Sequence, residues 1–366
     1  MERENNSQLS WAGAIVIAVL VTLFAFLGAR MIASMRSRNT FGTYALVNLP
    51  NNESLEVVGD GFIYYDGGSL TRVNSQGQTV WSSLIGANAQ FDAGVSGVAV
   101  WSGDQLTLVN WESGASESSS PMEADIISAK RGSKYAAVLL APEHDGRIIL
   151  LDTGGRQVDS IDMSGVTVLN YGFFSDDSLF WVMTLDTSGT VPTCVISTYN
   201  PGKRIVGSIT DNEQLMYQVL FQSSQVCCAG VTHLKVYDYT GTENVNRRKL
   251  IYGWYLVTAD EESLDPMMAY VLSAQYDAGV EMQDVRLIRS DVDEIVRMPF
   301  SCIALVAKDD RVYGFSSNGC IMIAQSGRKQ VEAYPTGLTL DRVYGVTNNG
   351  VAVLGYGSQL YLVNLP

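Results

Sequence analysis

Residues 61–81 read GFIYYDGGSLTRVNSQGQTVW, and this stretch decides the fold. An apolar run is followed by a Gly-rich turn, a second apolar run, and a second turn built from Asn, Ser, Gln and Gly. Short apolar runs bounded by such turn residues are typical of β-strands joined in hairpins. The stretch therefore predicts consecutive antiparallel strands.

The same pattern recurs along the chain at intervals of about 40 residues, the period of four-stranded propeller blades. Clear copies begin at Gly97, Tyr135 and Arg311, and the last copy, VAVLGYGSQLYLVNLP, begins at Val351. Adding an inner strand before each hairpin and an outer strand after it fills the chain with eight units. These units begin near residues 54, 87, 124, 166, 214, 254, 301 and 338.

We therefore predict an all-β protein in which residues 42–366 form a β-propeller, with eight four-stranded blades favoured. A seven-bladed ring with one irregular segment is the first alternative. A pair of β-sandwiches is the second, but it requires a break in the repeat and a linker near the middle of the chain. The sequence shows neither feature.

The two ends of this propeller share five letters, because LVNLP occurs at residues 46–50 and again at residues 362–366. The last copy supplies only the second and third strands of its blade, and the chain then stops. An uncovered strand edge is an aggregation hazard. We expect the segment FGTYALVNLP, residues 41–50, to pair antiparallel with the C-terminal strand and to close the ring.

Residues 11–29, WAGAIVIAVLVTLFAFLGA, contain no charged side chain. At about 1.5 Å per residue, a helix of this length spans the roughly 30 Å hydrocarbon core of a bilayer. No A-x-A-like cleavage site follows, so a signal peptide is disfavoured. We predict a single-pass transmembrane helix at residues 11–29, after a short tail at residues 1–10 and before a linker at residues 30–41. Lipid is thus one expected partner.

The side of the membrane that the propeller faces is left open by the sequence. Arg30, Arg36 and Arg38 follow the apolar segment and only Arg3 precedes it, which by the positive-inside rule places the propeller in the cytoplasm. A composition poor in charge, 17% charged residues, and rich in hydroxyl and amide groups favours an exported domain instead. Our expectation is a cell-membrane protein with its propeller on the extracytoplasmic side, the cytoplasmic side being the alternative.

The phrase FIYYDGGSLTRVNSQGQTVW resembles the blades of quinoprotein-like and WD40-like propellers. With the apolar segment at residues 11–29, the layout resembles an uncharacterised family of single-pass, membrane-anchored propeller proteins of Firmicutes. The resemblance implies a fold but no assigned active site. No functional residue is therefore carried over from it.

The adjacent Cys227 and Cys228 raise the question of a quinoprotein dehydrogenase, since enzymes of that class resemble this in having a vicinal disulfide beside their cofactor. Here the pair lies in the apolar run QVCCAGV, where we expect free thiols inside a strand. Cys302 is predicted on the innermost strand of its blade and Cys320 on the third. That separation is too large for a disulfide, and Cys194 has no evident partner. No cofactor is expected.

Other candidates for chemistry are few. His144 and His233 are expected in or next to turns, each without a second metal-ligating residue nearby. Acidic clusters are candidates for calcium ligands, but none has the spacing of a known calcium loop. No H-E-x-x-H, G-x-S-x-G or P-loop string occurs. The acidic clusters are Asp176–Asp177, Asp260–Glu261–Glu262, Asp291–Val292–Asp293–Glu294 and Asp309–Asp310.

A net charge of −14 argues against nucleic acid as a partner, because a phosphate-binding surface needs a basic patch. Two functions remain. The first is a membrane-anchored, non-catalytic module that binds a protein or an envelope polymer. The second is an envelope hydrolase or lyase with its site at the mouth of the central channel. Charged groups with perturbed pKa values in that channel would favour the enzyme, and an apolar or Ser/Thr lining would favour the binding module. No catalytic, cofactor or metal residue is assigned from the sequence.

Overall fold

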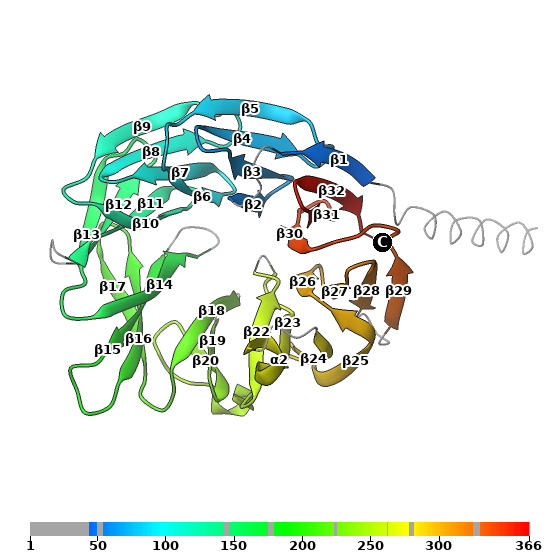
Figure 1. Ribbon diagram of the computed structural model, residues 1–366. Coiled ribbons are helices and arrows are strands. Elements are labelled where there is room, and N and C mark those ends of the chain that lie inside the picture. Colours follow the sequence, from blue (N-terminus) through cyan, green and yellow to red (C-terminus); the bar gives the residue numbers. More distant parts are fainter. Residues whose placement is uncertain are drawn as a thin grey trace, which may run out of the picture.

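The computed structural model describes residues 44–49, 54–142, 146–174, 179–222, 225–261, 263–277, 282–324 and 330–365. These residues form eight separate four-stranded antiparallel sheets arranged as a ring of blades (Figure 1). The predicted eight-bladed propeller is therefore confirmed, and the seven-bladed ring and the sandwich pair are wrong. The innermost strand of every blade begins within four residues of its predicted unit.

Blades 1 to 4 follow one another along the chain, each running from the channel to the rim. Their strands are β2 (Leu55–Val58), β3 (Gly61–Tyr65), β4 (Ser69–Asn74) and β5 (Thr79–Leu84); β6 (Gln90–Gly94), β7 (Gly97–Ser102), β8 (Gln105–Asn110) and β9 (Ser116–Pro121); β10 (Ile126–Arg131), β11 (Tyr135–Leu140), β12 (Arg147–Asp152) and β13 (Gln157–Asp162); and β14 (Thr167–Phe173), β15 (Phe180–Asp186), β16 (Thr193–Asn200) and β17 (Arg204–Asp211).

Blades 5 to 7 keep this order, with a two-residue outer strand in blade 5 and two short helices. Their elements are β18 (Met216–Gln222), β19 (Gln225–Gly230), β20 (His233–Asp238), the 3₁₀ turn η2 (Val245–Arg247) and β21 (Lys249–Leu250); β22 (Trp254–Ala259), β23 (Met268–Leu272), α2 (Ser273–Asp277), β24 (Met282–Ile288) and β25 (Asp293–Cys302); and β26 (Ala304–Lys308), β27 (Arg311–Phe315), β28 (Gly319–Ala324) and β29 (Gln330–Pro335).

Blade 8 is built from both ends of the described chain. Its strands are β30 (Arg342–Val346), β31 (Val351–Tyr356), β32 (Gln359–Asn364) and, as the outer strand, β1 (Tyr44–Asn48). β1 runs antiparallel to β32, with Tyr44 opposite Val363 and Asn48 opposite Gln359. The predicted closure of the ring by the N-terminal segment is confirmed.

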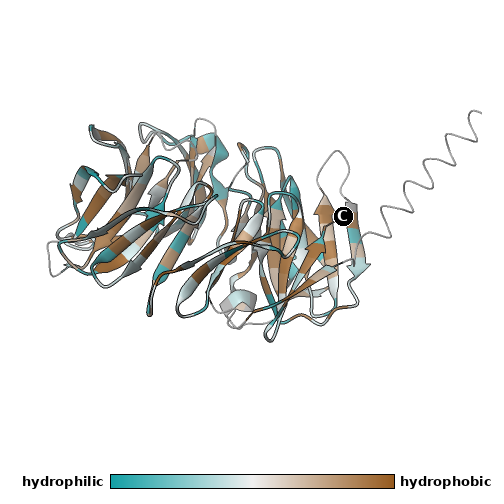
Figure 2. Cartoon of the chain, turned by 90° about the horizontal axis from the view of Figure 1, so that it is seen from above, coloured by the Kyte–Doolittle hydropathy of each residue, from teal (hydrophilic) through white to brown (hydrophobic). Residues whose placement is uncertain are grey.

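The core of the protein lies between the blades. Eight clusters of buried apolar side chains occupy the eight interfaces between neighbouring blades. Alternation along a strand explains this: Phe62 packs toward blade 8, while the next residue, Ile63, packs toward blade 2. Figure 2 shows apolar segments within the strands and polar segments in many of the loops at both faces of the ring.

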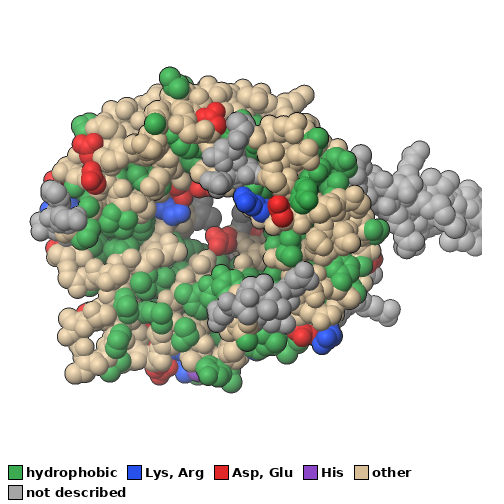
Figure 3. Space-filling model, viewed as in Figure 1, with side chains coloured by type: hydrophobic (Ala, Val, Ile, Leu, Met, Phe, Trp, Pro, Cys, Tyr) green, Lys and Arg blue, Asp and Glu red, His purple; other side chains and the backbone are tan. Residues whose placement is uncertain are grey.

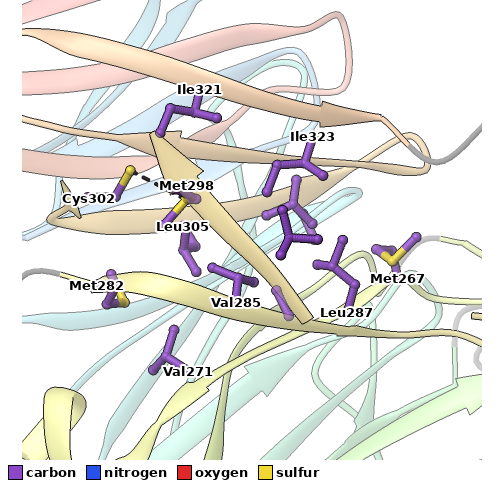
Figure 4. Packing of buried hydrophobic residues seen from close by; sticks show 14 residues of the cluster. Met267, Val271, Met282, Val285, Leu287, Met298, Cys302, Leu305, Ile321 and Ile323 are labelled. Carbon is purple, nitrogen blue, oxygen red and sulfur yellow. Dashed lines mark hydrogen bonds between the residues drawn. The ribbon is translucent and has the colours of Figure 1, made fainter. Parts of the chain in front are cut away.

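The interface between blades 6 and 7 shows how such a cluster is filled (Figure 4). Val285 and Leu287 of β24 face Ile321 and Ile323 of β28 across it. Cys302 also lies here, with its Sγ 3.7 Å from Met298 Sδ. The predicted place of Cys302 on an innermost strand is wrong, because β25 continues for ten residues and Cys302 pairs with Met282 as its last residue.

No helix within the described residues has the length and apolar character needed to span a bilayer. The predicted tail at residues 1–10, transmembrane helix at residues 11–29 and linker at residues 30–41 lie outside the described residues.

Candidate functional site

The innermost strands of the eight blades surround an open central channel. In Figure 3 the channel is seen end on, with acidic and basic side chains around its opening. The wall consists of β2, β6, β10, β14, β18, β22, β26 and β30 (Figure 1). Because each of these strands pairs with only one neighbour, its free edge and exposed side chains face the channel.

Five of these strands contain an irregularity at which one residue is skipped in the pairing with the second strand. A bulge of this kind bends the strand and re-aims the side chain of the unpaired residue. In every case that residue is apolar or aromatic. The five, which we call the apolar lining, are Ile127, Leu169, Tyr217, Val257 and Tyr344. Tyr217, Val257 and Tyr344 are partly buried and pack against the apolar clusters between blades.

Two residues of the apolar lining, Ile127 and Leu169, are exposed. Ile127 keeps 49% of its surface exposed and Leu169 keeps 39%. Side chains on an innermost strand are flanked by neighbouring blades, so water reaches them from the channel. An apolar surface that folding leaves uncovered at this position is available for a ligand.

Four charged residues, which we call the charged cluster, also lie at the channel: Glu56, Asp92, Lys130 and Glu261. Lys130 Nζ lies 2.6 Å from Asp92 Oδ1, and Asp92 Oδ2 accepts the Arg131 backbone N–H at 2.8 Å. The Asp92 carboxylate thus joins β6 to β10 while it pairs with the lysine. Burial would lower the pKa of Lys130, but Asp92 in particular outweighs this and raises it.

Glu56 lies on β2 and joins blade 1 to blade 2 in a similar way. Its Oε2 accepts the Ala93 backbone N–H at 2.8 Å. It also lines a cavity of about 250 Å³ with Leu55 of β2 and Phe91 of β6. Burial, with a smaller contribution from the Asp92 charge, raises the pKa of Glu56 to about 7, although the Ala93 N–H and Lys130 act in the opposite direction.

Glu261 follows β22, in blade 6, three blades away from Lys130 in blade 3. Gln218 Nε2 of β18 donates to Glu261 Oε1 at 3.1 Å. The residue is exposed, but the protein around it partly desolvates the carboxyl group and so raises its pKa, while the positive charge of Lys130 acts to lower it. The charge of Glu261 is one of the smaller contributions that raise the pKa of Lys130.

Glu56→Gln is expected to change the pH dependence of stability. A carboxyl whose pKa is raised on folding contributes stability that is complete below its unfolded pKa, near 4.5, and is lost as the pH rises through 7. The free energy of unfolding of the wild type should therefore fall by about 2–3 kcal/mol between these limits, and the fall should be much smaller in the variant. Urea unfolding at a series of pH values measures this. Equal slopes in both proteins would contradict the assignment.

Three tyrosines stack beside this region. Tyr217 and Tyr255 lie with ring centroids 4.9 Å apart, and Tyr255 and Tyr276 of α2 lie 4.2 Å apart. The Tyr217 hydroxyl accepts the Leu256 backbone N–H at 3.0 Å. The stack therefore fixes the inner ends of blades 5 and 6 and the orientation of Tyr217 in the apolar lining.

Two of the acidic clusters singled out in the sequence meet at a second cavity, of about 420 Å³, lined by Asp260, Ser263, Lys308, Asp309 and Asp310. The Asp309 backbone N–H donates to Asp260 Oδ2 at 3.0 Å. Asp309 and Asp310 form the β26–β27 turn with positive φ values, 50° and 60°. Within the described residues, no group of three or more His, Cys, Asp or Glu side chains is arranged to hold a metal.

The other sequence candidates are dispersed. Asp291 pairs with Arg289, and Asp293 pairs with Arg286, each at 2.8 Å. His233 is the first residue of β20, with Nδ1 3.0 Å from Thr232 Oγ1. His144, Asp176, Asp177 and Glu262 lie outside the described residues.

The five cysteines, all in the described part of the chain, are buried and none is in a disulfide. Cys227 and Cys228 are consecutive on β19 and therefore face opposite interfaces, toward blade 6 and blade 4 respectively. Burial raises the pKa of Cys227 to about 12, and it also raises those of Cys194, Cys228 and Cys320. The expected free thiols within a strand are confirmed for this pair.

A thiol titration is expected to find no reactive cysteine in the native protein, because the thiolate is the reactive form and these thiols are buried with raised pKa values. A chromogenic disulfide reagent should label five thiols after unfolding in guanidinium. Rapid labelling of Cys227 or Cys228 in the native state would contradict the packing of β19.

Sequence reasoning missed three of the four members of the charged cluster and named Glu261 only as part of an acidic run. A signal was present: the inner-strand runs LEVV and QFDAG each contain one charged residue, and IISAKR ends in two. A charged side chain on a strand flanked by neighbouring blades needs a polar partner. Here the partner comes from the next blade.

No family model matches the chain, and no curated protein matches it. Solved structures do. The chain is similar to the C-terminal WD40 domain of Sif2, with a TM-score of 0.57 and 12% identity over 89% of this chain and 97% of that one. It is similar to Saccharomyces cerevisiae Sqt1, with a TM-score of 0.55 and 11% identity over 89% and 96% of the two chains. At this identity the likeness shows the fold alone, and the fold is that of a WD40-like β-propeller with eight blades.

Proposed function

We propose that this chain is a membrane-anchored binding module whose central channel receives part of a protein partner. The apolar lining carries the proposal: the bulged side chains of Ile127 and Leu169 are 49% and 39% exposed, which leaves apolar surface uncovered on two innermost strands. A rigid ring of eight blades supports it, because a preformed site loses little entropy on binding.

The proposed membrane anchor is the segment at residues 11–29, which is uncharged and long enough to span a bilayer as a helix. We place the propeller on the extracytoplasmic side, where a surface poor in charged residues would meet an envelope protein. Protease treatment of intact cells tests the side: degradation of the propeller supports it, and full protection would contradict it.

Site-specific crosslinking tests the use of the channel. A photoreactive amino acid at position 127, in the full-length chain and in its own cells, is expected to capture a discrete partner. The matched control is position 84 on the outer strand β5, where Leu84 is 87% exposed. Capture from position 84 but not from position 127 would contradict binding in the channel.

A second function is favoured by one observation, the pKa of about 7 at Glu56 beside a cavity of about 250 Å³. A carboxyl with a pKa near the working pH is suited to general acid–base catalysis, as an envelope hydrolase or lyase would require. Turnover of an envelope polymer that Glu56→Gln abolishes, with crosslinking from position 127 retained, would establish this function instead.

A further inference from the structure

The connections between strands are divided between the two faces of the ring. Because neighbouring strands of a blade are antiparallel, the connection from the second to the third strand lies on the same face as the connection from the outer strand to the next blade. We call this face the upper face and the opposite one the lower face. The two faces differ in exposed apolar surface and in charge.

Four exposed apolar side chains lie on upper-face connections of blades 5 and 6, which are neighbours in the ring (Figure 1). The upper patch, as we call this set, consists of Leu215, Val231, Tyr252 and Tyr276. The Val231 N–H donates to the Leu215 carbonyl oxygen at 3.0 Å. The Ile251 N–H, just before Tyr252, donates at 2.8 Å to the carbonyl oxygen of the residue after Val231. Three of the four positions are therefore held next to one another.

The two tyrosines of the upper patch are ordered without a ligand. Tyr252 precedes Gly253, whose φ is 83°, and the Ser273 N–H at the start of α2 donates to the Gly253 carbonyl oxygen at 2.9 Å. Tyr276 of α2 stacks on Tyr255 with ring centroids 4.2 Å apart, and yet it stays exposed. Aromatic side chains that are already ordered lose little entropy when a partner covers them.

The exposed part of the apolar lining opens on the same face. The strands β10 and β14 begin on the upper face, and Ile127 and Leu169 are the second and third residues of these strands. Asp125 is exposed in the connection that leads to β10. A segment that enters the channel past Ile127 from this face therefore passes a carboxylate.

The upper face is also the more acidic one. Within the described part of the chain, its connections contain carboxylates but no lysine or arginine, and every lysine and arginine on a connection lies on the lower face. At the strand ends of the upper face, Arg147 and Arg342 are matched by Asp162 and Asp186. Such a surface favours a cationic ligand. The carboxylates on the connections whose side chains are described are Asp66, Asp104, Glu123, Asp125, Glu213 and Asp341.

The chain enters the ring from the lower face. Tyr44, the first residue of β1, lies opposite Val363 near the end of β32, and a third strand ends on the lower face. The proposed anchor at residues 11–29 is therefore joined to the lower face. The upper face is the one that is turned toward a protein partner.

We infer that the upper patch docks a segment of the protein partner that combines apolar side chains with lysine or arginine. This inference rests on the proposed function, since it gives the chemistry of that partner. The apolar side chains cover Tyr252 and its neighbours, and the cationic groups face carboxylates such as Glu123 and Asp125. A second copy of this acidic chain, or an anionic lipid surface, would meet repulsion instead.

Crosslinking in cells tests the docking face. A photoreactive amino acid at position 252 of the full-length chain should capture the same partner as position 127 does, through a peptide that contains lysine or arginine beside apolar residues. The matched control is position 264 on the lower face of blade 6, because Leu264 is 72% exposed and Tyr252 is 75% exposed. Capture of lipid or of a second copy from position 252 would overturn the inference, as would equal or stronger capture from position 264.

Fluorescence anisotropy with a labelled peptide of alternating leucine and lysine tests the chemistry, using the full-length protein in a neutral detergent. We expect saturable binding that weakens as salt is added, and no binding when glutamate replaces lysine. Tyr252→Ser should weaken binding at least about tenfold, and Glu123→Gln, Asp125→Asn should weaken it about threefold. Equal affinity for the two peptides would overturn the inference.

Lower-face substitutions are the controls for these variants. Leu264→Ser and Asp309→Asn remove an exposed apolar side chain and an exposed carboxylate from the lower face, and both should bind the peptide as the wild type does. Losses equal to those of the upper-face variants would overturn the location of the site.

The failure of this inference is distinguishable from failure of the proposed function. If position 127 captures a partner and position 252 does not, the channel binds its partner without the upper patch, and only this inference falls. If position 127 captures nothing in the otherwise unchanged chain, the proposed function itself falls.

Discussion

Deletion of residues 42–50 is expected to lower the free energy of unfolding of the full-length chain by about 5 kcal/mol, a large part of the stability of an ordinary domain. The deletion removes β1 and its five paired positions on β32. It also removes Leu49, which is 5% exposed and packs between blades 8 and 1 with Phe62 and Val353. Buried leucines contribute about 2–5 kcal/mol, and each net backbone hydrogen bond contributes about 1 kcal/mol.

Single substitutions separate the parts of this effect. Leu49→Ala should cost about 2–4 kcal/mol, because its side chain is buried. The matched control Leu46→Ala should cost less than about 0.5 kcal/mol, because Leu46 is 48% exposed on the same segment. Denaturant unfolding followed by tryptophan fluorescence measures the free energy of unfolding of the deletion and of both substitutions. A deletion as stable as the wild type would contradict closure of the ring by β1.

Asp211→Ala is expected to destabilise the protein by about 3–5 kcal/mol, because it leaves a buried lysine charge without its buried partner. Lys235 Nζ lies 2.9 Å from Asp211 Oδ2, and the two side chains are 3% and 1% exposed. The pair lies between β17 of blade 4 and β20 of blade 5. Gln214 Nε2 also donates to Asp211, at 3.2 Å, so the carboxylate joins several polar groups in one network.

A neighbouring carboxylate provides the control. Glu213 Oε2 lies 2.7 Å from the same Lys235 Nζ, but its side chain is 58% exposed. Glu213→Gln should therefore cost less than about 1 kcal/mol. The double variant Asp211→Ala, Lys235→Met should recover much of the loss, since it removes the unpaired charge. Equal losses for Asp211→Ala and Glu213→Gln would contradict the burial of the pair.

The same pair predicts the pH range over which this interface is stable. Burial would raise the pKa of Asp211, but hydrogen bonds from Lys235 and the Glu213 backbone N–H outweigh it and lower the pKa. Its contribution is therefore present above the ordinary aspartate pKa and is lost as the pH falls through the lowered value. Burial would lower the pKa of Lys235, but the two carboxylates raise it, so its contribution is lost only when the pH rises through that raised value.

The fold could be predicted from the sequence because each strand and turn depends on residues that are close together in the chain. Each blade is a set of short strands joined by turns, and residues such as Gly67 and Gly77, with φ of 99° and 80°, mark those turns directly. The number of repeats then predicts the number of blades. The closing strand was predictable because the last repeat lacks its outer strand and residues 46–50 repeat its final letters.

The candidate site could not be predicted because it depends on contacts between residues of different blades. Glu56 of blade 1 accepts the Ala93 N–H of blade 2, and Lys130 of blade 3 pairs with Asp92 of blade 2. The apolar lining depends on bulges, and a bulge shifts register by one residue without changing the composition of its strand. Ile127 and Leu169 therefore read as ordinary core positions until the pairing of β10 and β14 is known.

The most direct test of channel binding is crosslinking from position 127 of the full-length chain, compared with position 84 on the rim. We expect the partner to be captured from position 127 and not from position 84. Capture from position 84 that equals or exceeds capture from position 127 would contradict the proposal that this propeller binds its partner through the channel.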